Sequence, residues 1–116
     1  MNTLEYCYEA MGGDYKGVMS RLMKEERIIR FLTKFKNDNM LEPLEVALGA
    51  QNWEDAFRAA HNLKGVCANL GITSLENSSS ELTECLRDGT PTSDTTPLIE
   101  QVRTDYAKVM EVLKDY

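Results

Sequence analysis

Residues 52–71 read NWEDAFRAAHNLKGVCANLG, and this stretch has the clearest helix ends in the chain. Asn52 is a good N-cap, and Glu54 and Asp55 follow in the first turn, where carboxylates interact favourably with the helix dipole. Gly71 is suited to end the helix in the left-handed conformation. Small and apolar residues recur every three or four positions and predict one buried face, formed by Ala56, Ala60, Leu63, Cys67 and Leu70.

Helical spacing also dominates on both sides of this stretch, and no alternating strand pattern is convincing. Apolar stripes predict further helices over residues 2–11, 24–36, 41–49, 73–89 and 97–113. The connections between the four longest amphipathic segments are short, as in antiparallel bundles. The predicted fold is therefore all-α, an up-down four-helix bundle with additional short N-terminal helices. We expect one domain over residues 1–116, with the core bundle at about 25–115.

Several helix ends can be predicted from local sequence. Asp14 is placed to cap a second short helix. Thr73-Ser74-Leu75-Glu76 fits a capping box, and Thr96 followed by Pro97 is expected to begin the last helix. The apolar stripe of that helix consists of Leu98, Val102, Tyr106, Val109 and Leu113.

The composition excludes several classes of function. The net charge of -6 argues against a nucleic-acid-binding protein and gives no support for docking on an anionic membrane. No apolar stretch is long enough to span a bilayer, and the N-terminal residues do not resemble a signal peptide. Three widely spaced cysteines are a poor disulfide framework and are more typical of buried free thiols. We therefore expect a cytoplasmic protein.

The single histidine, His61, is predicted to face away from the core of the bundle. At about 100° per residue, it lies roughly 140° from the centre of the buried face. Lys64 and Gly65, three and four residues later, fall on its side of the helix. The alternative is that His61 is an ordinary surface histidine without a function. The residues around His61 argue against this alternative.

Those neighbours favour a docking site for another protein. Gly65 costs about 1 kcal/mol relative to alanine in mid-helix, so its lack of bulk needs a reason other than helix stability. No acidic residue occurs between Asp55 and Glu76, whereas Arg58 and Lys64 do. The local field therefore favours an anion more than the net charge suggests. Phe57, on the same outer face, either extends this patch or covers a neighbouring helix.

Independent catalysis has little support in the sequence. No carboxylate lies within one turn of His61, one histidine and three scattered cysteines do not form a zinc site, and no phosphate-binding loop is present. We therefore expect no metal site, no cofactor and no enzymatic turnover. A neutral imidazole is nevertheless a competent nucleophile and leaving group near pH 7. A phosphoryl carrier needs little more than this group, a positive charge and a docking surface.

The run from His61 to Gly71, HNLKGVCANLG, resembles the H-x-L-K-G-x-x-x-x-L-G signature of histidine-containing phosphotransfer (HPt) domains. The resemblance covers roughly residues 25–115. It implies that a receiver domain's phospho-aspartate phosphorylates His61, which passes the group to another receiver. It also implies that Lys64 stabilises the phosphoryl group, that Gly65 leaves room for the receiver, and that Mg²⁺ is bound by the receiver.

Two positions on the following helix bear on this resemblance. Many family members carry Glu or Gln, hydrogen-bonded to the histidine, where this chain has Thr83. Arg87 matches a basic position of some members and either assists the phosphate or is an ordinary charged helix end. The residues expected to contact the partner are Phe57, Arg58, Ala68 and Arg87.

Two other functions remain open at this stage. One is a helical adaptor that binds receivers without carrying phosphate. The other is the phosphoacceptor module of a larger histidine kinase. A hybrid histidine kinase is a further partner that the resemblance implies. A single exposed active face is most compatible with a monomer.

Overall fold

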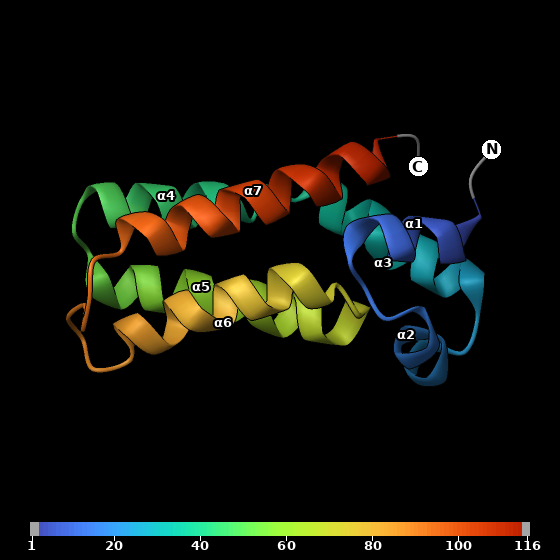
Figure 1. Cartoon of the computed structure of the whole chain (residues 1–116), viewed down its shortest axis with the longest axis horizontal. Helices are drawn as coiled ribbons and strands as arrows, with labels where there is room; N and C mark the ends of the chain where they lie inside the picture. The colour runs from blue at the N-terminus through green and yellow to red at the C-terminus, as the bar shows by residue number, and fades with distance from the viewer. Residues whose placement is uncertain (1–2, 115–116) are drawn as a thin grey trace.

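Seven α-helices and no strands make up the regular structure of residues 3–114, the part of the chain that the computed structural model describes (Figure 1). They are α1 (Leu4–Met11), α2 (Tyr15–Leu22), α3 (Glu25–Asn37), α4 (Leu41–Gly49), α5 (Trp53–Leu70), α6 (Thr73–Leu86) and α7 (Thr96–Leu113). The all-α prediction is confirmed. The expected first helical residue, Asn2, and the expected core limit at residue 115 lie outside the described residues.

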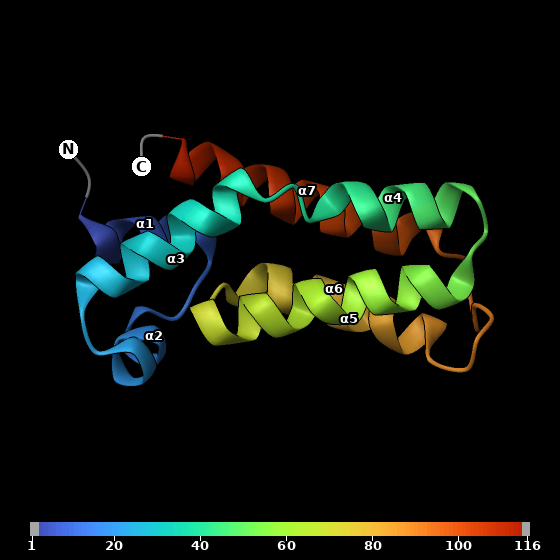
Figure 2. The same ribbon diagram turned by 180° about the vertical axis from the view of Figure 1, so that it is seen from behind.

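The helices form two layers along most of the molecule. In Figure 1, α4 and α7 lie above α5 and α6, and successive helices from α4 to α7 run in opposite directions. The shorter helices α1 and α2 gather at one end, together with α3. Figure 2 shows that α3 and α4 follow one another along the same edge, so that α3 approaches the last turns of α5.

Local chemistry sets the ends of several helices as predicted. The side chains of Asp14 and Asn52 accept hydrogen bonds from the backbone N–H groups of Gly17 and Asp55, which caps α2 and α5. Gly71 ends α5 at φ +71°, in the left-handed region that favours glycine. The buried residues of α5 are the five that the apolar spacing predicts.

The predicted capping box at Thr73 is wrong. The N-cap of α6 is Ile72, and no side chain caps this end. Ile72 is completely buried, and its N–H donates a hydrogen bond to the carbonyl of Cys67. Because of this tight turn, α6 begins at Thr73, one residue earlier than a capping box at Thr73 predicts. Ser74 uses its hydroxyl to contact the carbonyl of Gly12 in α1's terminal turn.

The last helix also differs by one residue from its prediction. It begins at Thr96, so Pro97 occupies the second position and Thr95 is the cap. Ile99 is buried at the first core position, whereas the predicted Leu98 is only partly buried. Further along, Tyr106 reaches the connection between α3 and α4. Its hydroxyl accepts from the Met40 N–H at 3.3 Å and donates to the Asp38 carbonyl at 3.4 Å.

Helices α1 and α2 pack against the turn between α5 and α6. The Tyr8 hydroxyl donates to the carbonyl of Leu70 at 2.6 Å, and the Asp14 N–H donates to the carbonyl of Gly71 at 2.8 Å. A Cβ on Gly71 would lie 2.8 Å from the backbone oxygen of Asp14, so glycine is required here for space as well as for φ. Arg21 of α2 donates to two carbonyls at the end of α5. These bonds satisfy backbone groups that a helix terminus otherwise leaves without partners.

Tyr8→Phe is expected to lower the free energy of unfolding by about 1–3 kcal/mol, because it leaves the buried carbonyl of Leu70 without its donor. Urea denaturation would measure the change. Tyr6→Phe is the matched control, since Tyr6 is exposed on the same helix, and a change within about 0.5 kcal/mol is expected there. Equal effects of the two substitutions would contradict an anchoring role for Tyr8.

Candidate functional site

His61 lies in the middle of α5 with its side chain exposed to solvent, as the helical wheel predicts. Ala60 and Leu63, on the opposite face of α5, are completely buried in the core. Within residues 3–114 the imidazole nitrogens have no hydrogen-bond partner, and the ring contacts Phe57 instead. The imidazole is therefore accessible from solvent.

Lys64 and Gly65 follow one turn after His61 on the same side of α5. Gly65 is exposed, and a Cβ built on it would meet nothing within 4 Å. Glycine is therefore not required here by packing inside the chain. Lys64 is half-buried and close enough to Glu84 of α6 to contribute to the lowering of that carboxyl's pKa, after the larger effect of the Arg87 hydrogen bond.

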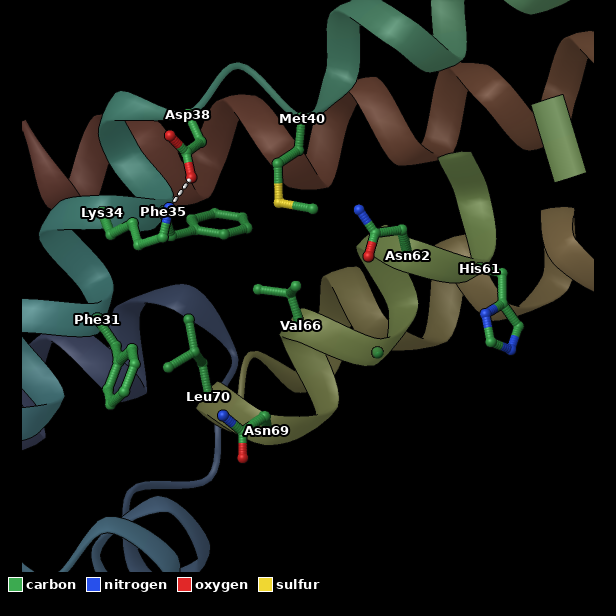
Figure 3. Close-up of a pocket in the computed structure, with 11 residues that line it drawn as sticks. Phe31, Lys34, Phe35, Asp38, Met40, His61, Asn62, Val66, Asn69 and Leu70 are labelled. Atoms are coloured by element: carbon green, nitrogen blue, oxygen red, sulfur yellow. Dashed lines mark hydrogen bonds and ion pairs between the residues drawn. The ribbon is translucent and has the colours of Figure 1, made fainter. Parts of the chain in front are cut away.

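An apolar groove of about 660 Å³ runs from His61 along α5 toward α3 (Figure 3). Phe31 and Phe35 line it from α3, and Val66 and Leu70 line it from α5. Gly65 also borders the groove, and His61 lies at one end of the row of lining residues in Figure 3. The exposed imidazole and the apolar groove therefore form one continuous surface.

The α3 side of this groove is not evident from the sequence. The apolar stripe that predicts a helix over residues 24–36 consists of Ile28, Ile29, Leu32 and Phe35, of which Ile29 is only partly buried and the other three are buried. Phe31 lies beside that stripe and is 38% exposed. The available signal was a large aromatic residue next to an already sufficient core face, but only the packing of α3 against α5 places Phe31 in the same groove as His61, at the opposite end (Figure 3).

Phe57, His61 and Arg87 form a row across α5 and α6. The ring centroids of Phe57 and His61 are 5.8 Å apart at an interplanar angle of 31°, and the guanidinium carbon of Arg87 lies 5.6 Å from the Phe57 centroid. Arg87 binds Glu84 through two hydrogen bonds, Nε–Oε2 at 3.0 Å and Nη2–Oε1 at 2.6 Å. Phe57 is half-buried between the two helices, so it covers α6 and borders the exposed site at the same time.

Two residues expected to contact a partner are engaged within the chain. Arg58 forms ion pairs with Glu54 and Asp55 in the first turn of α5, so its charge is largely balanced there. Ala68 is half-buried, and its carbonyl accepts a hydrogen bond from Arg21 of α2. Arg58 and Lys64 are both three residues from His61 on α5, and among the described residues Lys64 is the one of the two that forms no ion pair.

Thr83 is completely buried, and its hydroxyl donates to the carbonyl of Ser79 at 2.7 Å. Among the described residues, no hydrogen bond joins Thr83 to His61. Back-bonding to the preceding turn is common for threonine in helices and occupies its only donor. Thr83 therefore makes no polar contact with the imidazole among the described residues.

The remaining reactive groups lie away from this surface or are buried. All three cysteines are buried and form no disulfide within residues 3–114, as predicted, and burial raises the pKa of the Cys67 thiol to about 12. Within residues 3–114, no three His, Cys, Asp or Glu side chains gather as potential metal ligands. In the same range no helix is both long and apolar enough to cross a membrane. The surface around His61 is therefore the candidate functional site.

Comparison with known proteins agrees with this geometry. A family model described as the Hpt domain matches residues 31–111, which is more than half of the chain and includes the whole of α4 to α6. Searches of curated proteins and of solved structures found no significant match. Hpt domains take part in phosphotransfer in two-component systems, where they interact with response-regulator receiver domains. Its sequence match and its helical structure place this chain in the Hpt domain family.

Proposed function

We propose that His61 accepts a phosphoryl group from the phospho-aspartate of a receiver domain and passes it to the aspartate of another. The observation that carries this proposal is the exposed imidazole, which has no hydrogen-bond partner among residues 3–114 and lies beside Lys64 and the open surface at Gly65. The Hpt match supports it, because members of that family are phosphocarriers and not enzymes.

The transfer balances with groups that the two proteins supply. The neutral imidazole attacks phosphorus through its unprotonated nitrogen, an N–P bond forms, and the P–O bond to the receiver's aspartate breaks. The aspartate carboxylate leaves with the electron pair, and the proton on the other ring nitrogen stays with the ring. The second transfer is the reverse reaction with a different carboxylate as nucleophile.

In this proposal His61 and Lys64 contribute position and charge, and the receiver contributes the metal. Lys64 lies one turn from His61, on the side from which the phosphoryl group arrives, and offsets part of its negative charge. Mg²⁺ held by the receiver neutralises charge that develops on the transferred group. The chain itself requires no cofactor and acts as a monomeric cytoplasmic carrier.

The groove between α3 and α5 is the docking surface that we assign to the receiver. His61 lies at one end of the groove, and the apolar side chains of the lining offer burial to an apolar face of the partner, whereas Asn62 and Asn69 offer it hydrogen bonds. The Lys34–Asp38 ion pair at 2.8 Å borders it and leaves that rim polar. An apolar centre with a polar border is typical of transient protein interfaces.

Phe31→Ala is expected to raise the receiver concentration at half-maximal transfer about fivefold, or roughly 1 kcal/mol, with the limiting rate unchanged. Phe31 is already partly exposed, so little stability is lost. The control is Val46→Ala, because Val46 is a 65% exposed apolar residue on α4 that does not line the groove. A fall in the limiting rate alone would contradict a docking role for the groove.

The proposed function is tested by transfer of label from phosphorylated receiver domains of the host. The protein is expected to form an adduct that is labile in acid and stable in base, which is typical of a phosphorylated imidazole. A receiver that is dephosphorylated without labelling this chain, across the whole panel, would contradict the carrier function.

A further inference from the structure

In-line transfer requires the His61 imidazole to have a defined orientation, and no polar group among the described residues fixes that orientation by a hydrogen bond. Within residues 3–114 its ring has no hydrogen-bond partner, and the hydroxyl of Thr83 is committed to Ser79. An exposed side chain with two rotatable bonds samples several rotamers on the ps–ns timescale. In-line transfer requires one of them, because misplacement by about 1 Å can reduce a rate a hundredfold.

The His61 ring contacts Phe57, which lies four residues, or about one turn, earlier on α5. Side chains on a helix lean toward its N-terminus, so a residue at position i covers the side chain at i−4. The centroid distance of 5.8 Å between Phe57 and His61 is within the range of offset aromatic pairs. Phe57 is half-buried and packs against the core, so its own position is fixed more firmly than that of the exposed imidazole.

Arg87, the C-cap residue of α6, lies over the Phe57 ring. Its guanidinium carbon lies 5.6 Å from the Phe57 centroid, which is within the distance of a cation–π contact. The two hydrogen bonds to Glu84 hold the planar guanidinium in place, and they lower the pKa of Glu84 and raise that of Arg87. The orientation of the α5 ring is thereby tied to the position of α6.

We propose that Phe57 is a positioning residue, which holds the His61 ring in the orientation for transfer, and that Arg87 acts through Phe57. This inference rests on the proposed carrier function of His61. In place of the expected hydrogen bond from α6, Arg87 contacts the Phe57 ring, and the Phe57 ring contacts His61. This role also separates Phe57 from the docking residues of the groove, because a positioning residue affects the reaction after the receiver has bound.

Phe57→Leu tests this role, because leucine keeps apolar bulk against the core and removes the flat ring. With the receiver that labels the protein fastest, we expect the limiting transfer rate to fall about tenfold and the half-saturating concentration to change less than twofold. Phe57→Tyr retains the ring and should have the limiting transfer rate of the wild type. Phe31→Ala, in the groove, should show the opposite pattern. If Phe57→Leu changed only the half-saturating concentration and left the limiting rate as in the wild type, the proposal would be overturned.

Arg87→Met, made alone and together with Phe57→Leu, tests whether Arg87 acts through Phe57. We expect a loss of limiting rate in the wild-type background and no further loss in the Phe57→Leu background, because two residues that act as one unit are not additive. Equal losses in both backgrounds would mean that Arg87 contacts the phosphoryl group directly, which would overturn this part of the proposal.

A measurement on the protein alone separates this inference from the proposed function. Three-bond couplings across the Cα–Cβ bond of His61 report whether the side chain is held in one rotamer. We expect one dominant rotamer in the wild type and in Phe57→Tyr, and averaging in Phe57→Leu. Unchanged couplings would overturn the positioning role even if transfer occurs. Failure of every receiver to label the wild type would instead reject the carrier function.

Discussion

His61→Gln is expected to take up no label from any phosphorylated receiver, a loss of at least about a thousandfold relative to the wild type. The glutamine amide has similar polarity and reach but no nucleophilic nitrogen at neutral pH, and the chain contains no second histidine to replace it. The measurement is the amount of acid-labile, base-stable phosphate on the protein after incubation with labelled receiver.

Loss of the fold does not explain such a result, because His61 is exposed. The free energy of unfolding should change by no more than about 0.5 kcal/mol. Lys108→Gln is the matched control, since it introduces the same side chain on the exposed face of α7, in the other layer of the bundle, and should label normally. Label on His61→Gln would place the phosphoacceptor elsewhere.

Gly65→Gln is expected to make the protein more stable and to reduce transfer about a hundredfold at the receiver concentration that half-saturates the wild type. Its Cβ meets nothing within 4 Å inside the chain, and glutamine forms helices better than glycine by roughly 0.5–1 kcal/mol. The same side chain, however, occupies the space beside His61 through which the receiver approaches. Urea denaturation and the labelling rate measure the two opposite effects.

Gly49→Gln is the control for this substitution. Gly49 is the last residue of α4, and a Cβ there also meets nothing within 4 Å, but it does not line the groove. Its labelling rate should equal that of the wild type. A Gly65→Gln protein that transfers normally would contradict the assignment of this face to the receiver. A wild type that binds receivers without ever taking label, together with a Gly65→Gln variant that does not bind them, would support the adaptor alternative.

Features that depend on neighbours within one helical turn could be predicted from the sequence. The caps at Asp14 and Asn52, the end of α5 at Gly71 and the outward direction of His61 all follow from local hydrogen bonding and from the 3.6-residue period. The failures are also informative. The Thr73 motif has the right composition for a cap, but the packing of Ile72 into the core moved the start of α6.

The sequence by itself determined the all-α class, the buried face of α5 and the outward direction of its single histidine, because these depend on periodicity and on the type of each residue. Only the tertiary structure decided what surrounds that histidine. Phe31 lines the groove because α3 packs near α5, and Arg87 lies over Phe57 because α6 packs alongside α5. Such contacts join residues far apart in the chain, and their distances depend on how whole helices pack, which no local pattern records.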